Sequence, residues 1–518
     1  MRLSRGLVAV VSGLLLAVSG CTSSDPGSPD SSAASTTPAA PEAEEIAWSD
    51  CDEQIQSVIA GTPGSERDIL FECGSTQVPI TYAEPQGEKL TIFLVRARLA
   101  TQTDRIGSLV INPGGPGGSG ADAAIQRALT MPENVLNRFD LVGFDPRGVG
   151  LSTPAVECVP DELKDRVLAA EPRPVSDEQL DDSFALAQEV VDGCTDEYGD
   201  ALGTFNTTDT ARDLDLLREG LGDEQLTFLG WSYGTTLGST YAELFPDRVR
   251  ALALDAAVDP DNDPQADAEA SAAGLEAGFD AFAANCTSLV AGCPIGAEPR
   301  RFVDELLAQA AQAPIPSARA GETRQATPGV VLTAVQAGLY NTSAWPQLAQ
   351  GLAAARNGDA QGLFSLADAY NGRLQDGTYS NLIDANLAVT CADRDPDTQL
   401  AEDEIRALAA DWGQRYPLFG AGSAASLYTC SGWEAERTPL PARDAAGAAP
   451  ILVVGNTGDP VTPLPGAEDM AADLTSAVLL VWQGLGHTSY PKTGCVNDVV
   501  NAYLVDLVVP ADGATCPL

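Results

Sequence analysis

The stretch LTFLGWSYG, residues 226–234, decides the fold of this chain. It begins as a short apolar run, ends in the pattern Gly-x-Ser-x-Gly, and is followed directly by the helix-forming segment TTLGSTYAELFP. In a sharp strand-to-helix turn the two glycines remove side chains that would clash, and the serine is presented above the edge of the sheet. Ser232 is therefore a candidate nucleophile. The alternative is an ordinary buried turn, because the pentapeptide alone also occurs by chance.

Further short apolar runs place this stretch within a sheet. They cover residues 90–98, 108–115, 139–148, 249–259, 451–459 and 477–487. Several are continuous runs that end in Gly or Asp, which is typical of buried parallel strands. Helical stretches such as residues 210–222 separate them. This alternation predicts an α/β fold with a mostly parallel sheet.

The middle of the chain has a different pattern. Residues 261–445 are rich in alanine and have helical periodicity, for example in residues 298–313, where apolar side chains recur on one helix face. We interpret this block as a large helical cap, inserted before the strand at 451–459, that shapes a substrate site. The core then consists of two segments, residues 46–260 and 446–518.

His487 is the only histidine in 518 residues. A serine hydroxyl is a weak nucleophile until a base takes its proton, and histidine is the usual base. A lone histidine more often lies on the surface or is hydrogen-bonded in a core. Here its position, directly after a late strand, and the lack of any other imidazole favour the role of general base.

Asp459 ends the run at 451–459 and is the candidate acid that orients the histidine. The order Ser, Asp, His along the chain is one of the known arrangements of such triads. Asp393, within the cap, and Asp498, after the histidine, are less well placed. Thr462 follows closely and is either a helix N-cap or a residue that steadies the Asp459 loop.

The segment INPGGPGGSG, residues 111–120, is a candidate for stabilising an oxyanion. Its glycines allow the backbone to approach a ligand closely, and its prolines have no N–H. We expect the N–H of Gly115 to act together with that of Tyr233, the residue after the serine. A phosphate-binding loop is the alternative, but the segment lacks a Walker lysine and the dinucleotide glycine spacing.

The first twenty residues have the charge-then-apolar order of an export signal. Val-Ser-Gly before Cys21 resembles the lipobox of bacterial lipoproteins, which predicts a lipid anchor on Cys21; an ordinary secretory signal is the alternative. Residues 21–45 are rich in Ser, Pro, Ala and acid and are predicted to form a disordered tether. We expect an exported protein held on the outer face of the bacterial cell membrane.

The chain has 11 cysteines, and ten remain if Cys21 carries lipid. An even number in an exported chain predicts disulfides, although some thiols could instead stay free. Pairing neighbours in the sequence gives Cys51–Cys73, Cys158–Cys194, Cys286–Cys293, Cys391–Cys430 and Cys495–Cys516.

The net charge is −44, from 29 basic and 73 acidic residues. This balance argues against nucleic acid as a partner, because phosphate binding needs a basic face. It would not repel a cationic substrate such as a free amino terminus. One histidine and no His-Glu-x-x-His motif argue against a zinc protease.

Together the motifs resemble those of the exported tripeptidyl aminopeptidases, which are α/β-hydrolases related to proline iminopeptidases. The resemblance covers roughly residues 45–516 and rests on INPGGPGGSG (111–120), FDPRGVGLS (144–152), GWSYGT (230–235), GNTGDPVTP (455–463) and GLGH (484–487). In proline iminopeptidases the first motif reads His-Gly-Gly-Pro-Gly, and Pro113 replaces that histidine here. We expect Asp145 to Gly148 to form a structural turn whose arginine binds nearby acids or carbonyls.

The resemblance implies an exopeptidase that removes short peptides, namely tripeptides, from free N-termini through attack by Ser232. It implies no metal or organic cofactor. Acids near the cap would bind the substrate ammonium, and Asp393 and Asp259 are the candidates. A carboxylesterase or lipase is the nearest alternative, because such a triad does not distinguish an ester from an amide. A surface-anchored binding lipoprotein without catalysis is a more distant one.

Overall fold

The computed structural model describes residues 41, 43–258 and 263–518, and within them ten strands form one sheet in the order β1-β2-β3-β5-β4-β6-β7-β8-β9-β10. The strands are β1 (Ala47–Asp50), β2 (Ile69–Pro79), β3 (Lys89–Leu99), β4 (Gly107–Asn112), β5 (Phe139–Phe144), β6 (Leu226–Trp231), β7 (Val249–Asp255), β8 (Ile451–Gly458), β9 (Ala477–Leu485) and β10 (Ala514–Cys516). Strands β4 to β10 pair in parallel, which confirms the predicted mostly parallel sheet.

One end of the sheet is antiparallel. β1, β2 and β3 pair antiparallel with one another, and β3 pairs antiparallel with β5. The run at 90–98 therefore lies in an antiparallel strand, whose burial alternates along its length. β1 and β2 mix polar with apolar residues, and for that reason they did not stand out in the sequence as strands.

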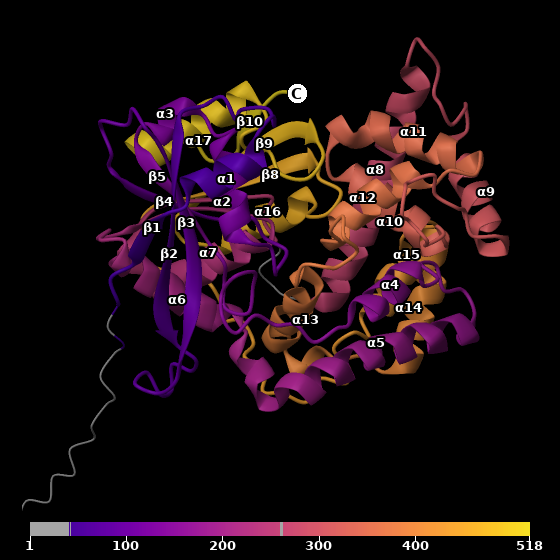
Figure 1. Ribbon diagram of the computed structural model, residues 1–518, viewed down its shortest axis with the longest axis horizontal. Coiled ribbons are helices and arrows are strands. Elements are labelled where there is room, and N and C mark those ends of the chain that lie inside the picture. Colours follow the sequence, from indigo (N-terminus) through magenta and orange to yellow (C-terminus); the bar gives the residue numbers. More distant parts are fainter. Residues whose placement is uncertain (1–40, 42, 259–262) are drawn as a thin grey trace, which may run out of the picture. The chain divides into compact units, whose positions relative to one another are not determined.

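The helices of the chain fall into two groups, one packed on the sheet and one outside it (Figure 1). Their bounds are α1 (Asp52–Ile59), α2 (Gly120–Ala128), α3 (Glu133–Leu136), α4 (Asp161–Ala169), α5 (Asp177–Tyr198), α6 (Thr207–Gly220), α7 (Tyr233–Leu244), α8 (Pro264–Ser288), α9 (Pro299–Gln312), α10 (Pro328–Leu339), α11 (Trp345–Arg356), α12 (Gln361–Asn371), α13 (Leu382–Asp393), α14 (Glu402–Arg415), α15 (Gly420–Ser426), α16 (Leu464–Asp473) and α17 (Gly494–Asp506).

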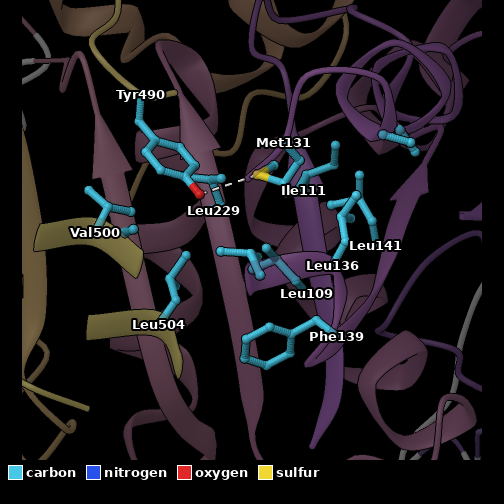
Figure 2. Close-up of a cluster of buried hydrophobic side chains, with 14 of the residues drawn as sticks. Leu109, Ile111, Met131, Leu136, Phe139, Leu141, Leu229, Tyr490, Val500 and Leu504 are labelled. Carbon is cyan, nitrogen blue, oxygen red and sulfur yellow. Dashed lines mark hydrogen bonds between the residues drawn. The ribbon is translucent and has the colours of Figure 1, made fainter. Parts of the chain in front are cut away.

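Helices cover both faces of the central strands. Every residue of β4, β5 and β6 is buried, which explains their continuous apolar sequences. On one face α1, α2, α3 and α17 pack on the sheet; Figure 2 shows Val500 and Leu504 of α17 beside Leu229 of β6. On the other face lie α6, α7 and α16. The two layers fix the strand ends, where the predicted residues Ser232, Asp459 and His487 lie.

The second group forms a helical layer with hydrophobic clusters of its own. α8 to α15 belong to it and lie within the segment predicted as a cap. α4 and α5, which the sequence placed in the first core segment, also pack there (Figure 1). Phe184 of α5, for example, stacks on Tyr428 with ring centroids 4.3 Å apart. The helical layer is larger than residues 261–445 because the apolar side of α5 is buried against α14 and α15.

The described chain contains five disulfides, and all five predicted pairs are confirmed. Arg147 is fully buried, where it donates two hydrogen bonds to Asp213 and others to backbone carbonyls, so its predicted structural role is also confirmed. No helix of the described residues is long and apolar enough to cross a membrane. The predicted signal and Cys21 lie outside those residues, as does most of the predicted tether.

Candidate active site

Ser232 lies in a sharp turn between β6 and α7. Its backbone has φ +55° and ψ −126°, a conformation that non-glycine residues rarely adopt and that concentrates at functional sites. A Cβ on Gly230 would lie 2.3 Å from the carbonyl oxygen of Gly234, and one on Gly234 would lie 2.7 Å from that of Asn112. Both glycines are therefore required by close approach of the backbone, as the motif predicted.

His487 and Asp459 follow the neighbouring strands β9 and β8 and lie side by side. Nδ1 of His487 is 3.0 Å from each carboxylate oxygen of Asp459. Burial alone would raise the pKa of the Asp459 carboxyl, but the His487 imidazole and two backbone N–H groups outweigh burial and hold that pKa below its ordinary value. The carboxylate is therefore kept charged beside the imidazole, which it can orient.

Thr462 contacts both members of this pair. Its N–H donates to Oδ1 of Asp459 over 3.0 Å, and its Oγ1 lies 3.4 Å from Nδ1 of His487. α16 begins at Leu464 with Pro463 in the N-cap position, so the interpretation of Thr462 as a helix N-cap is wrong. Thr462 instead belongs to the loop that holds the carboxylate.

The glycine-rich loop at 113–118 rests directly on the turn that bears Ser232. A Cβ on Gly114, whose φ is +94°, would lie 2.5 Å from the carbonyl oxygen of Trp231. The N–H of Gly114 donates to Oδ1 of Asn112 and is thus occupied. In the described part of the chain no acceptor binds the N–H of Gly115 or that of Tyr233, so both remain available as donors.

Two residues of the helical layer reach these loops, and neither was predicted. The carbonyl of Tyr340, after α10, accepts the N–H of His487 over 2.8 Å, and its ring meets the imidazole edge-on with centroids 5.3 Å apart. Nδ2 of Asn386, on α13, donates to the carbonyl of Pro116 in the glycine-rich loop over 3.0 Å. No sequence motif marks either residue, because both contacts depend on how the helical layer lies against the sheet.

A pocket of about 620 Å³ opens beside Ser232. Its lining comes from the core and from the helical layer, and includes Gly115, Tyr233, Thr462, Asp267, Thr390, Asp393, Arg394, Ser426 and Leu427. A pocket of this size accommodates a small molecule or a short peptide segment.

Asp393 is the predicted ammonium-binding acid that reaches this pocket. Its carboxylate accepts the N–H of Thr207 over 2.8 Å and the hydroxyl of Thr207 over 2.6 Å. Burial raises the pKa of Asp393 to about 7. The Thr207 hydroxyl also lies 2.5 Å from the hydroxyl of Tyr233. The other predicted acid, Asp259, lies outside the described residues.

Comparison with known proteins agrees with this geometry. The family model of the alpha/beta hydrolase fold matches residues 107–492. Serine protease Hip1 of Mycobacterium tuberculosis is 38% identical over 457 residues, which cover 86% of this chain and 87% of that protein. Carboxylesterase B of the same species is 34% identical over 502 residues, 95% of this chain and 94% of the relative. Tripeptidyl aminopeptidase of Streptomyces lividans is 31% identical over 467 residues, 86% of this chain and 83% of the relative. The chain therefore belongs to the α/β-hydrolase family, as a serine hydrolase related to the serine proteases and tripeptidyl aminopeptidases.

Proposed function

We propose that this serine hydrolase is an exopeptidase that releases short peptides, namely tripeptides, from the free N-termini of peptides or proteins. One observation carries the proposal: the Asp459–His487 pair lies at the edge of the sheet that also presents the strained Ser232, beside a pocket with a buried carboxyl group in its wall. The relatives named serine protease and tripeptidyl aminopeptidase support the peptide-bond specificity.

In the proposed reaction Ser232 Oγ attacks the scissile carbonyl carbon while His487 Nε2 takes the hydroxyl proton. The tetrahedral intermediate collapses, the C–N bond breaks, and the imidazolium returns the proton to the leaving amine. Water then attacks the acyl-enzyme, with the same imidazole as base, and releases the short peptide and the free serine. Asp459 holds the imidazole in the required tautomer and stabilises the imidazolium.

The negative charge that develops on the carbonyl oxygen needs donors that are already in place. The N–H groups of Gly115 and Tyr233 are suited to this task, because the described chain offers them no acceptor and both residues line the pocket.

A free N-terminus would be recognised by charge. Asp393, the last residue of α13, lies in the pocket wall. Its carboxylate faces the first turn of α6, whose N–H groups favour a negative charge. In its ionised form it can pair with the substrate ammonium. Because burial raises the pKa of Asp393 to about 7, this form is present near and above neutral pH.

The decisive experiment compares three substrates: a tripeptide anilide with a free amine, the same anilide with an acylated amine, and a short acyl ester. We expect the free-amine anilide to give the highest kcat/KM. Faster cleavage of the acylated peptide would overturn the exopeptidase proposal. Sequencing the products released from a peptide library would then count the residues removed at each turnover.

A carboxylesterase is the second candidate, favoured by the relative named carboxylesterase B. It predicts that the ester is turned over fastest and that a free amine is irrelevant. Labelling with a fluorophosphonate separates both candidates from a binding protein without catalysis: the unmodified protein should be labelled and the Ser232→Ala variant should not.

We also propose that the protein is exported and anchored through lipid on Cys21. Five disulfides in the described chain fit an oxidising compartment. Metabolic labelling of the producing cells with a fatty acid tests the anchor. Label on the full chain and none on the Cys21→Ala variant supports it, and an unlabelled full chain contradicts it.

A further inference from the structure

Asp255, at the end of β7, is a buried acid for which the proposed reaction has no role. It is 1% exposed, and β7 lies between β6, which leads to Ser232, and β8, which leads to Asp459. Its carboxylate does not replace that of Asp459, because Nδ1 of His487 is already paired with Asp459. Burial raises the pKa of Asp255, so a charged carboxylate here depends on its partners.

The partners of the Asp255 carboxylate lie in the loop directly after His487. The N–H of Ser489 donates to both carboxylate oxygens, at 3.1 and 2.9 Å, and the N–H of Tyr490 donates over 2.8 Å. Thr488, between these residues and the histidine, has φ +67°, which is strained for a β-branched residue. A loop with such a residue keeps its conformation only when its surroundings hold it.

The backbone of Asp255 holds the nucleophile at the same time. Its carbonyl oxygen accepts the N–H of Ser232 over 3.0 Å. The residue before the serine adds a second link, since Nε1 of Trp231 donates to the carbonyl of Tyr490 over 3.0 Å. Tyr490 itself is anchored in the core, where its hydroxyl approaches the sulfur of Met131 (Figure 2).

Lys492 holds the other side of this loop. Its ammonium donates to the carbonyls of His487 and Thr488. Burial lowers the pKa of Lys492, while the charge of Asp255 acts in the opposite direction and favours the ammonium. The two side chains thus bind the N–H and C=O groups of one short segment and favour each other's charged form.

We propose that Asp255 is a positioning residue that fixes the distance between Ser232 and His487. Lys492 acts together with it, and we call these two side chains the clamp on the loop at residues 487–490. The inference rests on the catalytic roles proposed for Ser232 and His487. It predicts that loss of the clamp slows proton transfer from the serine without weakening substrate binding, because neither side chain lines the pocket.

The test is Asp255→Asn, which keeps the size of the side chain but removes its negative charge and replaces one of the two acceptor oxygens with an N–H₂ donor. We expect kcat for a tripeptide anilide to fall on the order of 10²-fold, the effect of a misplacement of about 1 Å, with KM within about twofold. The rate of fluorophosphonate labelling should fall in parallel. Lys492→Met should lower both rates by a smaller factor.

Asp384 offers a matched control in the helical layer. It is fully buried, accepts the consecutive N–H groups of Cys158 and Val159 at 2.9 and 2.7 Å, and pairs with Lys164. We expect both Asp384→Asn and Asp255→Asn to lower thermal stability, but Asp384→Asn should leave the labelling rate unchanged. A merely structural Asp255 would behave like this control.

Each outcome decides between the two proposals. A folded Asp255→Asn variant with the kcat and labelling rate of the unmodified protein overturns the positioning role. If this variant does not fold, Lys492→Met carries the test, and an unchanged labelling rate overturns the clamp. Absence of labelling in the unmodified protein is the distinct result that overturns the proposed function, and the positioning role with it.

Discussion

The sheet core and the helical layer contribute to the site in different ways. In the core, Ser232, Asp459 and His487 follow strands of one sheet, and their loops are held by backbone hydrogen bonds and by close contacts of glycines. The helical layer contributes individual side chains, among them Asp393 and Asn386. This difference suggests that the core performs the chemistry and that the helical layer selects the substrate. The contact of Tyr340 with His487 shows that the core and the helical layer are not fully separate.

The largest effect should come from the core. Ser232→Ala and His487→Ala should each lower kcat/KM by about 10⁴-fold or more, because the serine and its base act as a unit. The fold should remain, as judged by circular dichroism and thermal unfolding. Ser288→Ala, at the exposed end of α8, is the matched control and should keep full activity. Near-normal turnover by His487→Ala would refute the mechanism, since the chain has no second imidazole.

The same contrast explains how much could be predicted from the sequence. The site residues of the core could be located because apolar strands, closely packed glycines and acids at strand ends each give a recognisable pattern in the local sequence. Parallel strands then bring their carboxyl ends to one edge of the sheet. The five disulfide pairs followed from simple neighbour pairing, because each links segments close in sequence.

The remaining features depend on tertiary packing. Tyr340 and Asn386 lie on ordinary helical segments and gain their roles only where the helical layer contacts the sheet. Asp255 ends a recognisable strand, but its partners at 489 and 490 are more than 230 residues away in sequence. α5 precedes Ser232 in sequence yet packs with helices that follow Ser232. No local period or motif encodes such pairings.

Asp393→Asn should have the next largest effect, on binding of the free amine. A hydrogen bond between charged groups contributes about 1.5–3 kcal/mol, so KM for the free-amine anilide should rise roughly 10- to 100-fold. KM for the acylated anilide should not change.

The pH dependence of KM provides a second readout for Asp393. Its carboxyl is charged above its pKa of about 7, whereas the substrate amine is charged below about 7.7–8.0. In the unmodified enzyme KM should therefore fall as the pH rises through 7, and this dependence should be absent in Asp393→Asn. Equal pH profiles for the two proteins would remove Asp393 from substrate recognition.

Tyr340→Ala tests whether the helical layer takes part in the chemistry. An edge-on aromatic pair contributes about 0.5–1.5 kcal/mol, so loss of the ring should lower kcat by up to about tenfold. The peptide and the short ester should be affected equally, because the ring contacts His487 and does not line the pocket. Tyr340→Phe keeps the ring and should keep kcat. A rise in KM for the peptide alone would instead place Tyr340 in substrate selection.

The smallest effect on turnover should come from the disulfide Cys391–Cys430, which joins two walls of the pocket. Cys391 follows Thr390 on α13, and Cys430 follows Ser426 and Leu427. Removing it as Cys391→Ala/Cys430→Ala should cost about 2–4 kcal/mol of stability and raise KM for the peptide. The rate of fluorophosphonate labelling should not change, because Ser232 and its neighbouring loops are held by the core.

The matched control for this disulfide is Cys286→Ala/Cys293→Ala. This pair also lies in the helical layer, but it closes a loop with a sequence separation of 7 rather than 39, and neither cysteine is next to a pocket residue in the sequence. Its loss should cost less stability and leave KM unchanged. If removal of Cys391–Cys430 slows labelling as much as peptide cleavage, the helical layer supports the nucleophile itself, and the division between chemistry in the core and selection in the helical layer fails.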